Sequence, residues 1–174
     1  SFQPRGPIPR PDTEPERHAL IIGAGLAGCA TAWALAELGW RSTLIDRAQA
    51  PATQGSGNPA GLFHGIVTPQ DGAHARFNRA AALEAQRAVS VAMAQHGVAG
   101  STEGLLRLES AHGDEHLATM QHTLQRLALP ARYVQALSAH EASARSGRAL
   151  PCPAWWYPGG GWVHPAGWRA PGGW

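Results

Sequence analysis

The sequence predicts an α/β fold whose first elements form a strand–helix–strand unit. Two observations carry this prediction. An apolar run at residues 18–22 leads directly into a Gly-x-Gly-x-x-Gly turn, and an uncharged Ala- and Leu-rich stretch follows the turn. A second expected strand, at 41–46, then ends in an acid. A strand, a glycine turn, a helix and a second strand in this order are typical of a parallel βαβ unit.

Each glycine of the turn has a structural reason. Gly23 allows the tight turn, Gly25 lets the backbone approach a pyrophosphate, and Gly28 lets the helix pack on the strand. The helix N-terminus offers unpaired N–H groups and a partial positive charge to phosphates. Asp46 closes the second strand, where its carboxylate can accept hydrogen bonds from a ribose. The unit, residues 18–46, therefore predicts a Rossmann-like site for a dinucleotide.

The uncharged stretch has a second interpretation as a membrane span, because residues 19–36 carry no charge. Three glycines at its start weaken such a helix, and Gly39 ends it. The flanking residues show no aromatic belt. We therefore expect no membrane-spanning segment, and the missing basic leader argues against a signal peptide.

Composition indicates a globular chain of about one domain. Apolar residues make up 44% of the 174 residues and charged residues 15%. The net charge of +2 is too small to predict nucleic-acid binding by itself. All 14 basic residues are arginine, so lysine Schiff-base chemistry is excluded. The two cysteines, Cys29 and Cys152, form no disulfide framework, and together with the absent export signal they predict a cytoplasmic location.

The rest of the chain reads as helices that alternate with isolated strands. Residues 1–17 carry five prolines and are expected to form a linker, with the folded domain at 18–174. The expected elements are a helix at 71–95, a strand at 104–109, a helix at 114–127, a short strand at 132–135, and a helix that runs from a Ser138–Glu141 capping box to Gly147. On the first of these helices, one face is expected to carry Phe77, Ala81, Ala85, Ala88 and Ala92. The aromatic, turn-rich segment from Pro151 is expected to place Trp155, Trp156 and Trp162 in the core of a second layer.

The loop after Asp46 is rich in glycine and resembles a known family together with four other segments. The loop reads Gly-Ser-Gly-Asn-Pro-Ala-Gly-Leu-Phe-His-Gly at 55–65, and the other segments lie at 23–46, 77–82, 104–109 and 160–165. They are similar to the C-terminal, FAD-dependent half of the bifunctional tRNA 5-methylaminomethyl-2-thiouridine biosynthesis enzymes (MnmC). More broadly, residues 18–168 resemble the D-amino-acid oxidase and glycine oxidase superfamily.

The resemblance implies a Rossmann-like FAD-binding domain with part of an inserted, substrate-facing layer. It implies oxidative removal of a carboxymethyl group from the amine of a modified wobble uridine in tRNA, with FAD as cofactor. It also implies an upstream methyltransferase domain that uses S-adenosylmethionine. The implied cofactor-binding residues are the pyrophosphate-binding Gly23, Gly25 and Gly28, the ribose-binding Asp46, Arg47 near the adenosine, and Ser56, Gly57, Asn58 and Gly61 along the flavin. The sequence identifies no catalytic acid or base.

Both ends of the chain depart from the family pattern. The chain begins at Ser1 rather than at methionine, and it stops before the strand that supplies the adenine contact in the family. We therefore expect a fragment that is truncated at its C-terminus, binds FAD weakly and does not turn over substrate by itself. Three alternatives stay open at this point: an oxidase of free glycine-like amino acids, a NAD-dependent dehydrogenase, and an inactive nucleotide-binding fragment.

Four other features each have two possible explanations. The pattern from His112 to His116 matches an inverted zinc-peptidase motif, but it sits at a helix start without a third ligand, so we expect no metal site. His64 lies in the glycine-rich loop and is either a pocket residue or a packed loop histidine. Arg76, Arg79 and Arg87 form either a phosphate-binding stripe or a solvated helix face. The tryptophan-rich segment favours a core over a base-stacking platform.

Overall fold

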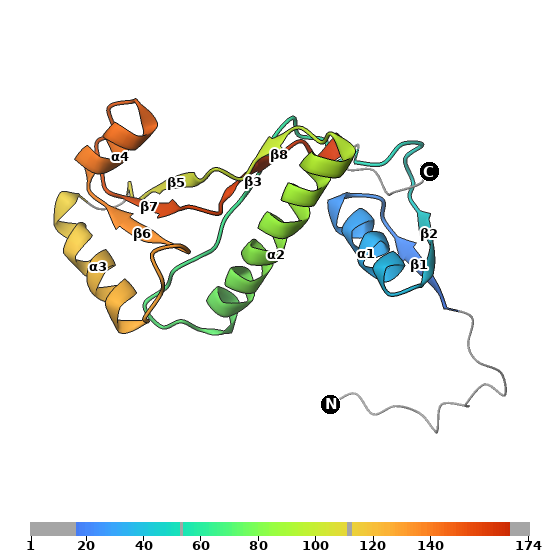
Figure 1. Ribbon diagram of the computed structural model, residues 1–174, viewed down its shortest axis with the longest axis horizontal. Coiled ribbons are helices and arrows are strands. Elements are labelled where there is room, and N and C mark those ends of the chain that lie inside the picture. The colour runs from blue at the N-terminus through green and yellow to red at the C-terminus, as the bar shows by residue number, and fades with distance from the viewer. Residues whose placement is uncertain (1–16, 53, 111–112, 168–174) are drawn as a thin grey trace, which may run out of the picture.

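The computed structural model describes residues 17–52, 54–110 and 113–167 (Figure 1). The strand–helix–strand unit lies at one end of the molecule, and a sheet with two short helices lies at the other. The long helix α2 and a small second sheet lie between them. The expected linker, residues 1–17, lies outside the described residues except for Arg17. The segment from Trp168 onward also lies outside them.

The predicted βαβ unit is confirmed. Strand β1 (His18–Ile22) pairs in parallel with β2 (Arg41–Ile45), with Ile22 opposite Ile45, and helix α1 (Leu26–Glu37) connects them. Ile21 and Leu44 face α1 and pack against it, whereas the opposite face is exposed. On that face Leu20 is 62% and Ile22 86% exposed, so none of the described elements covers it.

Helix α2 (Ala73–His96) matches the predicted helix at 71–95 and ends at Gly97, which adopts a left-handed conformation with φ 64°. Its C-terminal half supplies Val89 and Ala92 to a core that also holds Cys29 of α1 and Val163. Phe77, which begins the face expected to carry Ala81, Ala85, Ala88 and Ala92, is 73% exposed. Ala75, two residues earlier and on the opposite side of the helix, is 1% exposed, so this end of α2 buries a different face.

A second, three-stranded antiparallel sheet was not predicted. It has the order β3 (Gly61–Phe63), β8 (Gly161–Val163) and β4 (Gly100–Ser101). Each strand has only two or three residues, which is too short for a periodic signal. The sheet nevertheless joins the glycine-rich loop to the C-terminal segment, because Leu62 pairs with Trp162.

The third sheet has the order β5 (Leu105–Leu108), β7 (Ala154–Tyr157) and β6 (Gln135–Leu137). A 3-10 turn (Asp114–His116) leads into α3 (Leu117–Arg126), which packs Met120 against Trp155 and Tyr157. Helix α4 (Ala139–Ser146) packs Ala142 against Leu137 and Ala154, and a 3-10 turn (Pro165–Gly167) ends the described chain. As expected, Trp155 is a core residue, but Trp162 is 37% exposed.

Two local predictions for this part of the chain have different outcomes. The capping box is confirmed: Ser138 Oγ accepts the Glu141 N–H at 3.2 Å, and Glu141 Oε2 accepts the Ser138 N–H at 2.8 Å. The predicted strand at 132–135 is displaced and begins at Gln135. The N–H groups of Tyr133 and Val134 instead donate to the Pro130 carbonyl, which forms a turn.

Candidate functional site

The turn between β1 and α1 is tight, and its conformation depends on glycine at two positions. Gly23 has φ 100°, a region that favours glycine, and its N–H donates to the Ile45 carbonyl at 2.7 Å. A Cβ on Gly28 would overlap the Gly23 carbonyl oxygen and lie 3.0 Å from its carbon. The first turn of α1 therefore packs directly on the backbone that leaves β1.

Asp46 follows β2 and holds the turn in place through two backbone hydrogen bonds. Its Oδ2 accepts the Ala24 N–H at 2.7 Å, and its Oδ1 accepts the Ala48 N–H at 2.8 Å. The hydrogen bond from Ala24, and to a smaller extent that from Ala48, lowers the pKa of the Asp46 carboxyl below its ordinary value. The carboxylate is exposed and charged at neutral pH, and its remaining lone pairs can accept hydrogen bonds from a ligand hydroxyl.

Ser56 reaches the start of α1 from a loop thirty residues away. Gly25 occupies the N-cap position and has no side chain to cap the helix, and Ser56 Oγ instead accepts the Leu26 N–H at 3.0 Å. A Cβ on Gly25 would lie 3.2 Å from this oxygen, so the close approach favours glycine there. The site thus presents a hydroxyl and the helix N-terminus side by side.

Three hollows of about 560, 360 and 120 Å³ surround this turn, and Asp46 lines all of them. Within the described chain, no hydrogen bond engages the N–H groups of Gly25, Ala27 and Gly28. Together with the partial positive charge of the helix N-terminus, these donors suit an anion such as a pyrophosphate. The carboxylate at one side suits a hydroxyl-bearing group such as a ribose.

The structure brings together five of the nine predicted cofactor-binding residues directly at the turn. These are Gly23, Gly25, Gly28, Asp46 and Ser56. Arg47 lines the largest hollow, and its guanidinium donates to Gln54 Oε1 at 3.2 Å.

The other three predicted residues line none of these hollows. The Gly57 N–H donates to the Gln54 carbonyl, and the Asn58 side chain donates to the Gly55 carbonyl at 3.2 Å. Gly61 lies in β3 and pairs with Val163. The loop therefore leaves the turn after Ser56.

Sequence reasoning missed three residues that help to form the site. Ala24 donates to Asp46 and also accepts the Ala52 N–H at 3.0 Å, so it ties the loop to the turn. Ala52 adopts φ 54°, which is unusual for a residue with a Cβ and gives no sequence signal. Gln54 lines two of the hollows. Only Ala24 had an available signal, because it lies between the first two glycines.

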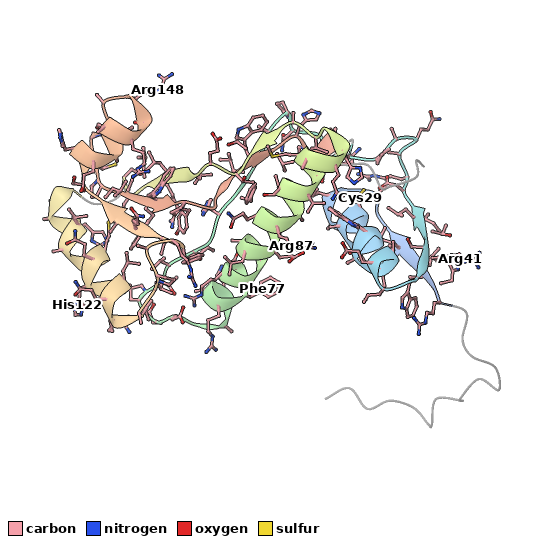
Figure 2. The ribbon with its side chains drawn as sticks, viewed as in Figure 1. Cys29, Arg41, Phe77, Arg87, His122 and Arg148 are labelled. Atoms are coloured by element: carbon pink, nitrogen blue, oxygen red, sulfur yellow. The ribbon has the colours of Figure 1, made fainter. Side chains whose placement is uncertain are left out.

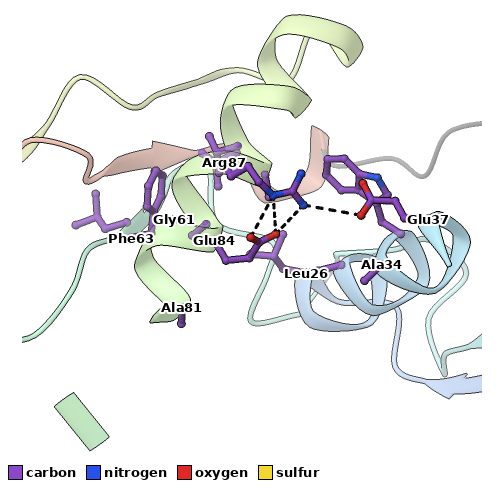
Figure 3. Close-up of a pocket in the computed structure, with 15 residues that line it drawn as sticks. Leu26, Ala34, Glu37, Gly61, Phe63, Ala81, Glu84 and Arg87 are labelled. Carbon is purple, nitrogen blue, oxygen red and sulfur yellow. Dashed lines mark hydrogen bonds and ion pairs between the residues drawn. The ribbon is translucent and has the colours of Figure 1, made fainter. Parts of the chain in front are cut away.

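An apolar cavity of about 390 Å³ lies elsewhere, between α1 and α2 (Figure 3). Its rim carries Arg87, whose guanidinium lies 2.7 Å from Glu84 and 3.9 Å from Glu37. Arg79 pairs with Asp71 at 2.6 Å. Two of the three arginines that could form a phosphate-binding stripe on α2 are therefore paired with acids of the chain. Figure 2 shows Arg87 and Phe77 along this helix.

Two further observations concern metals and membranes. Within residues 17–52, 54–110 and 113–167, no group of three or more His, Cys, Asp or Glu side chains is placed to hold a metal ion. His112, the first residue of the zinc-peptidase-like pattern, lies outside the described residues. No described helix is both long enough and apolar enough to cross a bilayer.

The sequence matches the family described as FAD dependent oxidoreductase (DAO) over residues 18–168. The chain belongs to this family. The matched family depends on FAD, so the chain is not assigned to a family of nicotinamide-dependent dehydrogenases. The match agrees with the Rossmann-like fold and with the expected second layer.

Curated relatives of this DAO-family chain carry a common name. The chain is 51% identical over 149 residues to the tRNA 5-methylaminomethyl-2-thiouridine biosynthesis bifunctional protein MnmC of Methylibium petroleiphilum. This alignment covers 86% of this chain and 22% of the relative. It is 40% identical over 163 residues to the protein of the same name from Ralstonia nicotianae, and this alignment covers 92% of this chain and 24% of the relative. The chain thus spans less than a quarter of the length of these relatives.

Solved structures share the fold. The L-α-glycerophosphate oxidase of Mycoplasma pneumoniae, solved with FAD bound, has a TM-score of 0.62 at 20% identity. The superposition covers 87% of this chain and 40% of the oxidase. The glycine oxidase of Bacillus cereus has a TM-score of 0.57 at 20% identity, and the superposition covers 87% of this chain and 41% of the oxidase. The Ala24–Gly28 turn, Asp46 and Ser56 of the DAO-family chain fit the adenosine diphosphate half of FAD by their donors and charge.

Proposed function

We propose that this chain is part of an FAD-dependent amine oxidoreductase and binds the adenosine diphosphate half of the cofactor. The observation that carries the proposal is the turn at Ala24 to Gly28, which Asp46 and Ser56 hold from either side at 2.7 and 3.0 Å. In this arrangement the N–H groups of α1 bind the pyrophosphate and the Asp46 carboxylate accepts the ribose hydroxyls. Arg47 lies at the adenosine side.

We further propose that the substrate is the carboxymethylaminomethyl group of a wobble uridine in tRNA. The support is the shared name of relatives that are 36–51% identical to this chain. Oxidation of the N–CH2 bond of the carboxymethyl group removes a hydride and a proton and leaves an imine. Addition of water then releases the aminomethyl base and glyoxylate. The hydride acceptor would be supplied by FAD, whose adenosine diphosphate half this chain would hold in place.

The proposal includes two partners. The first is tRNA, and the second is a methyltransferase domain upstream in the same polypeptide that uses S-adenosylmethionine. The word "bifunctional" in the names of the relatives supports the second partner. A tRNA substrate also supports the proposed cytoplasmic location.

FAD titration of the purified chain tests the cofactor site. The change of flavin fluorescence gives the dissociation constant for the wild type, for Asp46→Ala and for Glu103→Gln. Glu103 is an exposed acid in the turn after β4 and lines none of the hollows around Asp46, so its variant is the matched control. We expect Asp46→Ala to weaken binding about tenfold or more, because charge-assisted hydrogen bonds to the ligand are lost. Equal affinity of all three proteins would overturn the proposal.

A further inference from the structure

His164 holds the glycine-rich loop from a position 105 residues further along the chain. Its Nδ1 donates to the Pro59 carbonyl at 2.8 Å. A carbonyl oxygen only accepts hydrogen bonds, so this contact requires the proton on Nδ1. The segment at 160–165 is one of the five that resemble the known family, and this hydrogen bond connects it to the loop.

The backbone of His164 is held in place by its neighbours. Its N–H donates to the Ala99 carbonyl at 2.8 Å. The residue before it, Val163, is 3% exposed and pairs with Gly61 of β3. The residue after it, Pro165, is also buried. The imidazole therefore extends to the loop from a backbone that the small sheet β3–β8–β4 holds on both sides.

The loop is held at both ends and is exposed between them. Ser56 binds the first turn of α1 at the start of the loop, and His164 binds the loop near its end. Residues 57–60 are all exposed. Within the described chain, no hydrogen bond engages the N–H groups of Asn58 and Ala60. This stretch therefore offers two backbone donors to a ligand that lies along it.

We propose that His164 is a positioning residue for the flavin ring of FAD and acts through the Pro59 carbonyl on the loop. The inference rests on the proposed function, which places the adenosine diphosphate half of the cofactor at the turn beside Ser56. Ser56 belongs to both the turn and the loop, so a cofactor bound at the turn has the loop as its neighbour. The polar edge of the isoalloxazine ring carries oxygen and nitrogen acceptors, which suit backbone N–H donors. By fixing Pro59, His164 keeps the N–H groups on either side of it in place for the ring.

Comparison of FAD with ADP as ligands of the full chain isolates the contribution of the flavin. His164→Ala removes the donor, and His164→Asn supplies one again, because the asparagine amide nitrogen lies as many bonds from Cα as Nδ1 does. His122→Ala, at an exposed histidine of α3, is the matched control (Figure 2). We expect the dissociation constant for FAD to rise about three- to tenfold in His164→Ala and that for ADP to stay unchanged. The asparagine variant is expected to recover most of the FAD affinity.

A second measurement needs no cofactor. In the 15N-labelled chain, the heteronuclear NOE of the Asn58 and Ala60 amides reports how firmly the loop is held. It is expected to fall in His164→Ala and to match the wild type in His164→Asn and in His122→Ala. If circular dichroism shows that His164→Ala is unfolded, His164→Leu replaces it, because leucine keeps much of the bulk of the ring without the donor.

The outcomes separate this proposal from the cofactor proposal. An FAD affinity that His164→Ala leaves unchanged, or an equal loss of affinity for FAD and ADP, would overturn the role of His164. A wild-type chain that binds ADP as tightly as FAD would also overturn it and would leave the adenosine diphosphate site intact. Absence of binding for both nucleotides would refute the proposed function and the flavin role with it. An unchanged NOE in His164→Ala would refute the hold of His164 on the loop itself.

Discussion

Replacement of Gly28 by alanine tests whether the turn depends on direct contact between α1 and the backbone after β1. The new Cβ would lie 3.0 Å from the Gly23 carbonyl carbon and closer still to its oxygen, whereas ordinary van der Waals contact begins at 3.4 Å. It would also meet the Ile21 side chain at 3.5 Å. The main obstacle is backbone, so it cannot rotate away, and the helix must move instead.

The expected cost is about 1–3 kcal/mol of unfolding free energy, the range for overpacked sites, and loss of nucleotide binding accompanies it. Gly55→Ala is the matched control. A Cβ at Gly55 would meet no atom within 4 Å, and its φ lies outside the left-handed region. That variant is expected to change stability by less than about 0.5 kcal/mol.

Urea denaturation followed by circular dichroism measures both variants against the wild type. We expect the midpoint of Gly28→Ala to fall clearly below that of the wild type, and the midpoint of Gly55→Ala to match it. Equal midpoints for all three proteins would refute the packing argument at the turn.

Three further predictions follow from the packing, the cap and the charges. Met120→Ala empties a core position that is 1% exposed and is expected to cost about 2–5 kcal/mol, measured by urea denaturation; a cost below about 1 kcal/mol would contradict the assigned core. Ser138→Ala removes the capping box of α4 and is expected to cost about 1 kcal/mol in the same assay, and Ser90→Ala, on the exposed side of α2, is the control. The folded-state pKa of Asp46 is lowered, so its stabilising contribution is present above the unfolded pKa of about 3.9 and is lost as the pH falls through the folded value. Thermal denaturation is therefore expected to show a smaller loss of stability between pH 5 and acid pH in Asp46→Asn than in the wild type, and identical pH profiles would contradict the hydrogen bonds assigned to Asp46.

The strand–helix–strand unit and the long helices were predictable because their signals are local. The glycine turn, the 3.6-residue periodicity of α2 and the Ser138 cap each lie within a few residues of one another. The second sheet was not predictable, because β3, β4 and β8 are too short for a period and pair only across long separations. The displacement of strand β6 has a local cause instead, because the N–H groups of Tyr133 and Val134 donate to the Pro130 carbonyl in a turn.

The turn between β1 and α1 could be predicted in its sequence-local part, whereas its long-range contacts could not. The glycines and Asp46 follow from a motif with fixed spacing. Ser56 was expected along the flavin, but the structure places its hydroxyl at the start of α1, because Gly25 offers no cap of its own. The left-handed Ala52, which carries the loop back to Ala24, has no sequence signal at all.

The most direct test of the central claim is an NMR titration of the 15N-labelled chain with FAD. The claim is that the adenosine diphosphate half of FAD binds at the Ala24–Gly28 turn beside Asp46. The account predicts saturable shifts that are largest at the amides of Ala24, Gly25 and Leu26 and that need about tenfold more FAD in Asp46→Ala. Shifts confined to other parts of the chain, or an unchanged FAD affinity in Asp46→Ala, would contradict it.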